Sequence, residues 1–185
     1  MPEGLSGSAG GRLSSPRTPC GKEPINRTAA RAIILDPDGR VLLLRTLNPD
    51  STSGSYWWIV PGGGVRSGEE LVEGARREVF EEVGIRLDSP MRHVLTRNAV
   101  FHMSGRMIRQ QEYYYLVSIS HLQSGEIRLN DRDEELARID QFKWWSLEEI
   151  DTSTDVFIPG GIANMLRRSL SNPNTCAEYL SEVDE

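Results

Sequence analysis

The chain has 185 residues, of which 38% are hydrophobic and 26% are charged, values typical of one globular domain that buries its own core. Its formal net charge of −6 argues against nonspecific binding to nucleic acid or to an anionic membrane. The two cysteines, Cys20 and Cys176, imply neither a disulfide framework nor a metal site, and no apolar run is long enough to span a membrane. These features exclude a disulfide-stapled scaffold and predict a cytoplasmic monomer or homodimer, with neither nucleic acid nor membrane as a partner.

Glycine, serine and proline dominate the N-terminal residues, which lack the apolar stretch of a signal peptide. Such a composition has too little apolar surface to offset the entropy of ordering. We therefore expect a disordered N-terminal tail over residues 1–26, a folded domain over 27–171 and a flexible acidic tail over 172–185.

The first predicted element is a β-hairpin over residues 27–46, where two apolar runs flank the turn signal Asp36-Pro37-Asp38-Gly39. Residues 56–64 predict a short strand that enters a glycine-rich turn. Ser67 is predicted to cap the helix that follows, with Glu70 completing a capping box.

Strand-like segments continue after this helix. Further strands are predicted at residues 92–103, 106–120, 126–129 and 141–145, and short helices at 146–150 and 160–170. Strands thus outnumber helices, with one long helix among them. The pattern indicates an α+β protein or a mixed sheet between helices.

Three glutamates near the end of the long helix form an unfavourable group, which we call the glutamate cluster: Glu78, Glu81 and Glu82. Their spacing of i, i+3 and i+4 places like charges on one patch of the helix. Gly84 is predicted to end the helix, so Glu81 and Glu82 lie in its last turn, where the dipole is negative. Each effect costs only a few tenths of a kcal/mol, but both act against the same residues.

A solvated helix face is the ordinary interpretation of such charges. It accounts well for Glu69, Glu70 and Glu73, which favour the helix N-terminus or have a partner within one turn. It accounts poorly for the glutamate cluster. Clustered carboxylate oxygens are the ligands that Mg²⁺ and Mn²⁺ prefer, and such ions usually also hold substrate phosphates. The sequence Gly62-Gly63-Gly64 before the helix allows the backbone to approach a ligand closely, although it is equally consistent with a tight turn.

The residues around the cluster resemble a known family. Gly63, Glu69 and the run from Arg77 to Ile85 match the Nudix box at every fixed position, and residues 58–63 are similar to the lead-in of that motif. The resemblance in layout extends over roughly residues 28–150. It implies an α+β fold, a Nudix-type α/β/α sandwich around a mixed β-sheet.

The resemblance also implies an activity: Mg²⁺- or Mn²⁺-dependent hydrolysis of a diphosphate linkage in a small-molecule, nucleotide-type substrate. By that match Glu78, Glu81 and Glu82 are metal ligands and catalytic residues, and Gly63 adds its backbone carbonyl to the metal. Arg77 orients the glutamates, with Glu69 as its ion-pair partner.

The general base is not assigned by these patterns. A box glutamate, Glu134 or Glu135 is a candidate, since members of the resembled family sometimes supply the base from the region of the last two, although a solvated loop is the favoured interpretation of Glu134 and Glu135. For substrate binding we consider Gly62, Gly63 and Arg45 for phosphate, and Tyr113 among the aromatic residues for a base. Most aromatics at strand spacing are core residues, so these substrate contacts are hypotheses.

Two other function classes remain. A non-catalytic Nudix ligand-binding or sensor module would share the fold but usually shows a damaged box, whereas the box here is intact. An isoprenoid diphosphate isomerase would require a cysteine near the core, and neither Cys20 nor Cys176 lies there in the sequence. A catalytic pyrophosphohydrolase is therefore the leading hypothesis.

Overall fold

A computed structural model describes residues 23–48, 54–103, 105–120, 127–129 and 139–182 of the chain. The strands are β1 (Ile25–Leu35), β2 (Val41–Leu47), β3 (Tyr56–Ile59), β4 (Gly62–Gly64), β5 (Arg92–Met103), β6 (Arg106–Ser118), β7 (Ile139–Trp145), β8 (Val156–Ile158) and β9 (Glu178–Glu182). The helices are α1 (Leu71–Val83), α2 (Leu147–Thr152) and α3 (Ile162–Ser171). Within these described ranges, no helix is long and apolar enough to cross a membrane.

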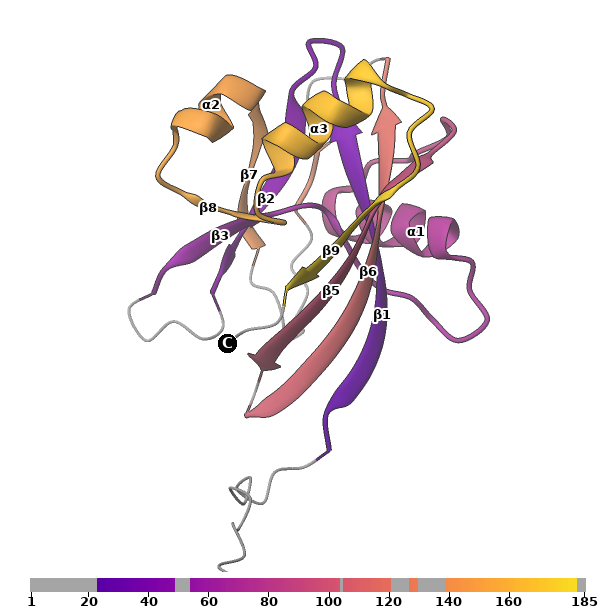
Figure 1. The fold of residues 1–185 in the computed structure, drawn as a ribbon, viewed down its shortest axis with the longest axis vertical. Coiled ribbons are helices and arrows are strands. Elements are labelled where there is room, and N and C mark those ends of the chain that lie inside the picture. The colour runs from indigo at the N-terminus through magenta and orange to yellow at the C-terminus, as the bar shows by residue number, and fades with distance from the viewer. Residues whose placement is uncertain (1–22, 49–53, 104, 121–126, 130–138, 183–185) are drawn as a thin grey trace, which may run out of the picture.

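The strands form one mixed nine-stranded sheet with the order β8-β3-β2-β1-β6-β5-β9, to which β4 adds on β1 and β7 on β2 (Figure 1). Both predicted hairpins, β1–β2 and β5–β6, are present and antiparallel. The central pair β1–β6 is parallel over its whole length, with Ala30 opposite Tyr113. This long-range pairing aligns strands that are about eighty positions apart in the chain. Strand β1 also pairs with the glycine-rich strand β4, so it connects β6 to that segment.

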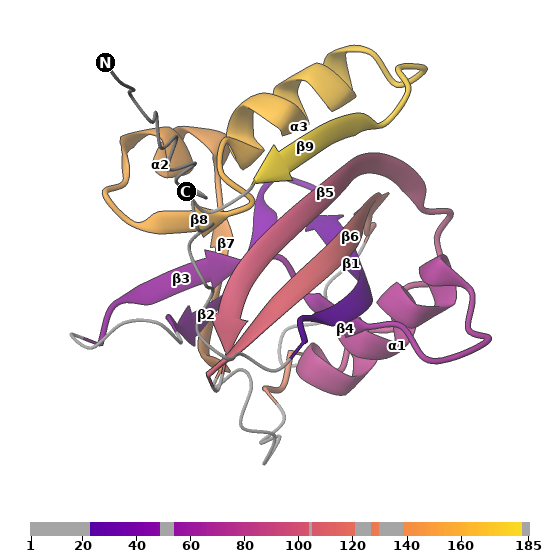
Figure 2. The same ribbon diagram turned by 60° about the horizontal axis from the view of Figure 1, so that its bottom comes forward.

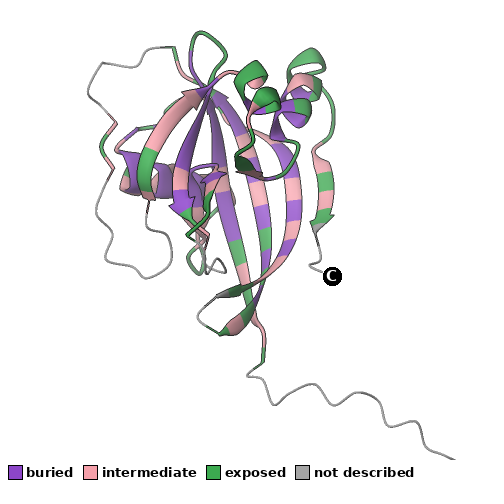
Figure 3. Ribbon diagram, turned by 90° about the vertical axis from the view of Figure 1, so that its left-hand side faces the viewer, coloured by how far each residue is buried: buried purple, intermediate pink, exposed green. Residues whose placement is uncertain are grey.

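Helices cover both faces of the sheet (Figure 2). Alternate residues of β1 enter different cores: Ile34 packs with Val79 and Val83 of α1, whereas Ile33 packs with Leu166 of α3 on the opposite face. Figure 3 shows this burial along the central strands. The expected α/β/α sandwich around a mixed sheet is confirmed.

Helix α1 ends as the sequence predicts but begins later. Gly84 adopts a left-handed conformation (φ 76°), and its N–H donates to the Phe80 carbonyl at 3.0 Å. The predicted cap at Ser67 is wrong, because the N-cap residue is Glu70 and no side chain caps it. Gly68 instead turns the chain at positive φ (78°), so the first helical turn starts three residues later.

The segment after α3 also differs from the prediction. Residues 178–182, expected to lie in a flexible tail, form β9, which pairs in parallel with β5. Leu180 packs against the α3-side core, and Glu178 forms an ion pair with Arg168 at 2.7 Å. Residues 127–129 are not a strand, although the Arg128 N–H donates to the Val83 carbonyl. Of the N-terminal tail expected over residues 1–26, residues 1–22 lie outside the described residues, whereas Ile25 and Asn26 belong to β1.

Candidate active site

Two carboxylates of the glutamate cluster lie against the glycine-rich segment. Glu78 and Glu82 are only 6% and 8% exposed, which is unusual for charged side chains. The N–H of Gly62 donates to Oε2 of Glu82 at 2.8 Å. A Cβ atom at Gly63 would lie 2.6 Å from Oε2 of Glu78. The acidic face of helix α1 therefore lies directly against the Gly62-Gly63 backbone, with no space for a side chain at Gly63.

Gly62 makes the closest backbone approach of the segment. Its φ of 138° is unfavourable for L side chains, and a Cβ atom there would come within 2.4 Å of the Ala30 carbonyl oxygen on β1. Strand β4 thus pairs closely with β1 in antiparallel orientation, with Gly62 opposite Arg31.

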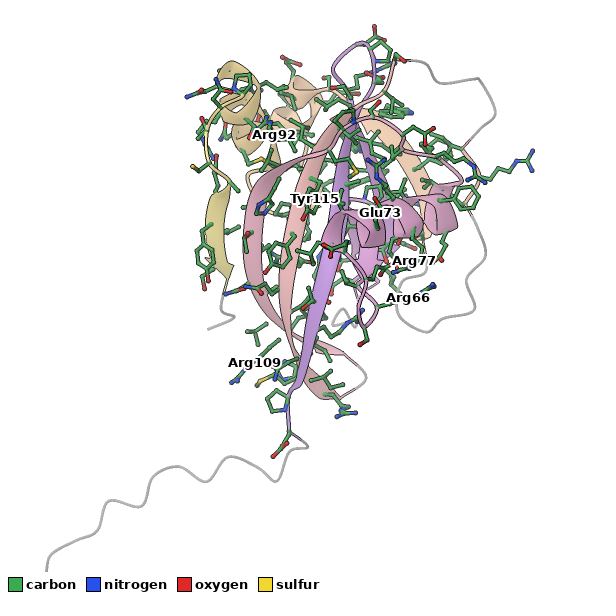
Figure 4. All side chains as sticks on the ribbon, turned by 90° about the vertical axis from the view of Figure 1, so that its right-hand side faces the viewer. Arg66, Glu73, Arg77, Arg92, Arg109 and Tyr115 are labelled. Atoms are coloured by element: carbon green, nitrogen blue, oxygen red, sulfur yellow. The ribbon has the colours of Figure 1, made fainter. Side chains whose placement is uncertain are left out.

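Arg77 binds the carboxylates together. Its guanidinium donates to both oxygens of Glu69 at 2.7 and 2.8 Å, to Glu78 at 2.5 Å and to Glu81 at 3.1 Å. It also donates to the Gly64 carbonyl at 2.9 Å. Hydrogen bonding to Arg77, with a further bond from the Arg66 N–H, lowers the pKa of Glu69 to about 2, and the Glu69 bond is the main cause that raises the pKa of Arg77. The predicted Arg77–Glu69 pair is present, and Figure 4 shows Arg77 with Arg66 on the α1 side.

These contacts modify the argument from repulsion. The sequence suggests three like charges without compensation, but Arg77 lies between Glu78 and Glu81, and Arg66 also pairs with Glu81 at 3.2 Å. The cluster is therefore partly neutralised by arginine: Arg77 reaches Glu81 at the helical i,i+4 spacing, and Arg66 reaches it from the segment before the helix. Its carboxylates are still concentrated at one end of α1 and facing Gly62 and Gly63.

The donor set fits a hard divalent cation in chemical type. Three carboxylates and the carbonyls of a glycine-rich turn supply only oxygen ligands, as Mg²⁺ and Mn²⁺ prefer. Among the described residues, no three acidic, histidine or cysteine side chains already converge as a preformed metal centre. Arg77 contacts one oxygen each of Glu78 and Glu81, and Arg66 contacts the other oxygen of Glu81, so these residues would hold a cation by sharing their oxygens with the arginines or after a side-chain rotation.

A buried charge network lies next to the glycine segment and was not anticipated from the sequence. Glu112 on β6 is 1% exposed. Its carboxylate accepts hydrogen bonds at 2.7–2.8 Å from Arg31, Arg97, Gln110 and Tyr114. Burial by itself raises the pKa of Glu112, but the charges of Arg31 and Arg97 and the Tyr114 hydroxyl lower it to about 2. Glu112 is therefore ionised and fully surrounded by donors.

One signal in the sequence could have indicated this network. Positions 110, 112 and 114 share the inward face of β6 with Ile108 and Leu116, so a glutamine and a glutamate interrupt an otherwise apolar face. A buried acid requires a partner. Arg97 lies directly opposite Glu112 in the predicted β5–β6 hairpin, whereas Arg31 comes next to Glu112 only through the β1–β6 pairing.

A cavity of about 700 Å³ opens beside the box segment. Its lining residues are Asn26, Arg27, Thr28, Gly64, Val65, Arg66, Ser67, Glu69 and Leu71. Arg27 and Arg66 bring positive charge to it, and the side chain of Arg27 lies over Gly64, where a Cβ atom would be 3.2 Å from Nη2. Neither Arg27 nor Arg66 was predicted from the sequence as a substrate-binding residue.

The other predicted substrate residues lie elsewhere. Arg45 forms a bidentate pair with Asp140 at 2.9 Å and stacks over Tyr56 on the β2–β3 side. The Tyr113 hydroxyl donates to Gln111, and its ring lies 5.7 Å from that of His93. Because side chains alternate along β6, Tyr113 faces away from Glu112. The structure thus brings Gly62 and Gly63 to the glutamate cluster but does not bring Arg45 or Tyr113 there. Glu134 and Glu135 lie outside the described residues.

Comparisons with known proteins concern the sequence and the overall fold. The sequence model of the NUDIX domain matches residues 25–163. An RNA pyrophosphohydrolase of Bartonella bacilliformis is 27% identical over 133 residues, which cover 66% of this chain and 78% of that protein. A shorter match to the RNA pyrophosphohydrolase of Caulobacter vibrioides is 40% identical over 62 residues, covering 34% of each chain.

Solved structures with the same fold include a MutT NUDIX hydrolase from Burkholderia pseudomallei, with a TM-score of 0.54 and 25% identity over 77% of this chain and 96% of that one. The NUDIX domain of Shewanella oneidensis NrtR, complexed with ADP ribose, has a TM-score of 0.56. It is 17% identical and covers 85% of this chain and 94% of that chain, so it supports the fold alone.

Proposed function

Because this chain belongs to the NUDIX domain family, matched over residues 25–163, we propose that it uses Mg²⁺ or Mn²⁺ to cleave a diphosphate linkage in a nucleotide-type substrate. The family match and the relatives make it a hydrolase acting on pyrophosphate bonds. The metal requirement and the substrate are the parts that we propose.

One observation carries the metal requirement: the nearly buried carboxylates of Glu78 and Glu82 lie against the Gly62-Gly63 backbone. Burying two like charges side by side is costly unless counter-charge is present. Arg77 supplies part of it to Glu78. We propose that Glu78, Glu81, Glu82 and the Gly63 carbonyl hold the cation.

A cation held by these residues would supply the charge that shields the phosphate oxygens, stabilises the leaving phosphate and makes a water more acidic. The protein's own groups then have three tasks. Arg77 fixes the orientation of the glutamates, and Glu69 in turn fixes Arg77. Arg27 and Arg66 bring positive charge to the adjacent cavity, where substrate phosphate binds. The base that takes the water proton is a box glutamate or Glu135.

Arg45 is not proposed as a phosphate ligand, because Asp140 already occupies its guanidinium. Tyr113 is retained only as a weaker hypothesis for a base contact, because its hydroxyl donates to Gln111 and its ring lies beside that of His93. For the substrate itself, the names of the relatives add a specific candidate. A 5′-triphosphorylated RNA end is a nucleoside triphosphate extended at its 3′ oxygen, so the same site chemistry applies to both.

The proposal is tested by incubating the purified protein with Mg²⁺ or Mn²⁺ and a panel of substrates. The panel contains nucleoside triphosphates, ADP-ribose, dinucleoside polyphosphates and a 5′-triphosphorylated RNA oligonucleotide. Products are separated by ion-exchange chromatography, and EDTA provides the metal-free control. We expect metal-dependent release of pyrophosphate, phosphate or a nucleoside monophosphate from at least one compound. Binding without any turnover would favour the non-catalytic sensor instead.

A further inference from the structure

Three consecutive backbone carbonyls of the segment before α1 are held by β1. The carbonyls of Val60 and Gly62 accept hydrogen bonds from Nη1 of Arg31 at 3.0 and 3.2 Å. The Pro61 carbonyl between them accepts from the Ala32 N–H at 2.9 Å. Arg31 therefore holds the Val60–Pro61 and Gly62–Gly63 peptide units, and the Ala32 N–H holds the Pro61–Gly62 unit that lies between them.

Arg31 has little freedom of its own. Its Nε donates to Oε1 of Glu112 at 2.8 Å, and the side chains of the pair are 15% and 2% exposed. Glu112 is held in turn by donors on β5 and β6. Burial would lower the pKa of Arg31, but the charge and hydrogen bond of Glu112 and, to a smaller extent, the charge of Glu82 raise it.

We propose that Arg31, anchored by Glu112, is a positioning residue that fixes the two peptide units flanking Pro61–Gly62, so that the Gly62 N–H holds Glu82 in place. The path is continuous: Glu112 binds Arg31, Arg31 binds the carbonyls on either side of the Pro61–Gly62 unit, and the N–H of that unit donates to Glu82 at 2.8 Å. A buried residue on β6 thereby sets the orientation of a carboxylate on α1. This inference rests on the proposed function, since it assigns Arg31 to the support of a proposed metal ligand.

A purely structural ion pair between β1 and β6 makes a different prediction. It would affect the stability of the sheet without changing the conformation around Gly62. The Arg31→Lys variant separates the two roles, because lysine keeps the positive charge beside Glu112 but lacks the fork that contacts the carboxylate and two carbonyls together.

The matched control is Arg92→Lys. Arg92 is also partly buried and donates to a backbone carbonyl, that of Ser169 on α3 at 2.9 Å, and it lies at the α3 end of the sheet in Figure 4. Both variants thus remove one arginine fork from a buried backbone contact. Of these two arginines, Arg31 contacts the segment before α1 and Arg92 contacts α3.

The experiment measures the hydrogen exchange of the Gly62 amide by NMR without metal, then Mn²⁺ affinity by electron paramagnetic resonance, then kcat and KM. For Arg31→Lys we expect at least tenfold faster exchange at Gly62, at least threefold weaker Mn²⁺ binding and a kcat reduced tenfold or more. KM should change less than threefold. Arg92→Lys should match the wild type in all four quantities.

Unchanged Gly62 exchange and unchanged Mn²⁺ affinity in a folded Arg31→Lys protein would overturn the proposal. If that variant does not fold, the wild-type measurement still tests the proposal. A Gly62 amide that exchanges in the wild type at the rate of an unfolded chain would also overturn the proposal. Failure of the proposed function has a different signature: no turnover of any substrate in the wild type, with Gly62 exchange still dependent on Arg31.

Discussion

The carboxylate of Glu78 lies so close to the backbone of Gly63 that a Cβ atom at Gly63 would be 2.6 Å from Oε2. Since real Cβ atoms do not approach other atoms so closely, any side chain at Gly63 must displace Glu78 or the strand. The observed position of the Glu78 carboxylate therefore requires glycine at position 63.

Gly63→Ala should therefore reduce kcat by about 100-fold, because a displacement of about 1 Å in a catalytic group can have that effect. Gly160→Ala is the matched control, as its Cβ would meet no atom within 4 Å. Steady-state kinetics of both variants provide the comparison. Equal kcat values for the two would show that the Glu78 position does not matter for turnover.

Arg77→Ala should have a larger effect than Glu69→Gln. Arg77 contacts Glu69, Glu78 and Glu81 directly, whereas Glu69 acts only through Arg77 and the Arg66 N–H. We expect kcat to fall at least 100-fold for Arg77→Ala and about tenfold or less for Glu69→Gln, with protein folding checked by circular dichroism. If Glu69→Gln were as damaging as Arg77→Ala, the order of their roles would be wrong.

The box could be predicted from the sequence because its parts are close together. Helical spacing places Glu78, Glu81 and Glu82 on one patch, and the Arg77–Glu69 pair spans only eight positions. The Glu112 network could be predicted only in part, since Arg97 lies opposite Glu112 in the expected β5–β6 hairpin, but Arg31 is 81 positions away and meets Glu112 only through a parallel strand pair. Local patterns carry no information on such register.

The C-terminal strand was missed for a related reason. Residues 178–182, Glu-Tyr-Leu-Ser-Glu, carry one aliphatic side chain and no alternation that distinguishes a strand from a polar tail. Their conformation depends on α3, which brings the chain back to the edge of β5. The helix cap at Ser67 failed because the capping-box pattern does not reveal the turn at Gly68.

Deletion of residues 178–185 should reduce the free energy of unfolding by about 1–3 kcal/mol, or roughly 3–10 °C in Tm, because the partly buried Leu180 and the β5–β9 pairing are lost. Differential scanning calorimetry measures the change. Glu178→Gln alone should cost less than about 1 kcal/mol, since the Arg168–Glu178 pair is largely exposed. A deletion variant with the wild-type Tm would indicate that β9 adds no stability.

Glu112→Gln should destabilise the protein by about 3–5 kcal/mol at neutral pH, because it leaves Arg31 and Arg97 buried without their counter-ion. Urea unfolding at pH 7 tests this value. A loss below 1 kcal/mol would mean that the two arginines find other compensation.

The same variant should change the pH dependence of stability in a defined window. The pKa of Glu112 is lowered from 4.5 to about 2 in the folded protein, so on acidification the unfolded chain takes up this proton first. The stabilising contribution of Glu112 is therefore complete above about pH 4.5 and is lost as the pH falls toward 2. Over that window Glu112→Gln should have a slope shallower by up to about 1.4 kcal/mol per pH unit. If the free energy of unfolding changed with pH equally in Glu112→Gln and the wild type, groups other than Glu112 would cause the acid sensitivity.

The central claim, that the glutamate cluster binds the divalent cation used in hydrolysis, is tested most directly by isothermal titration of Mn²⁺ into the wild type and Glu82→Gln. The control is Glu73→Gln, which removes the same charge from an exposed position of the same helix. We predict that Glu82→Gln weakens Mn²⁺ binding at least tenfold, while Glu73→Gln binds within twofold of the wild type. Equal Mn²⁺ affinity for Glu82→Gln and the wild type would contradict the claim.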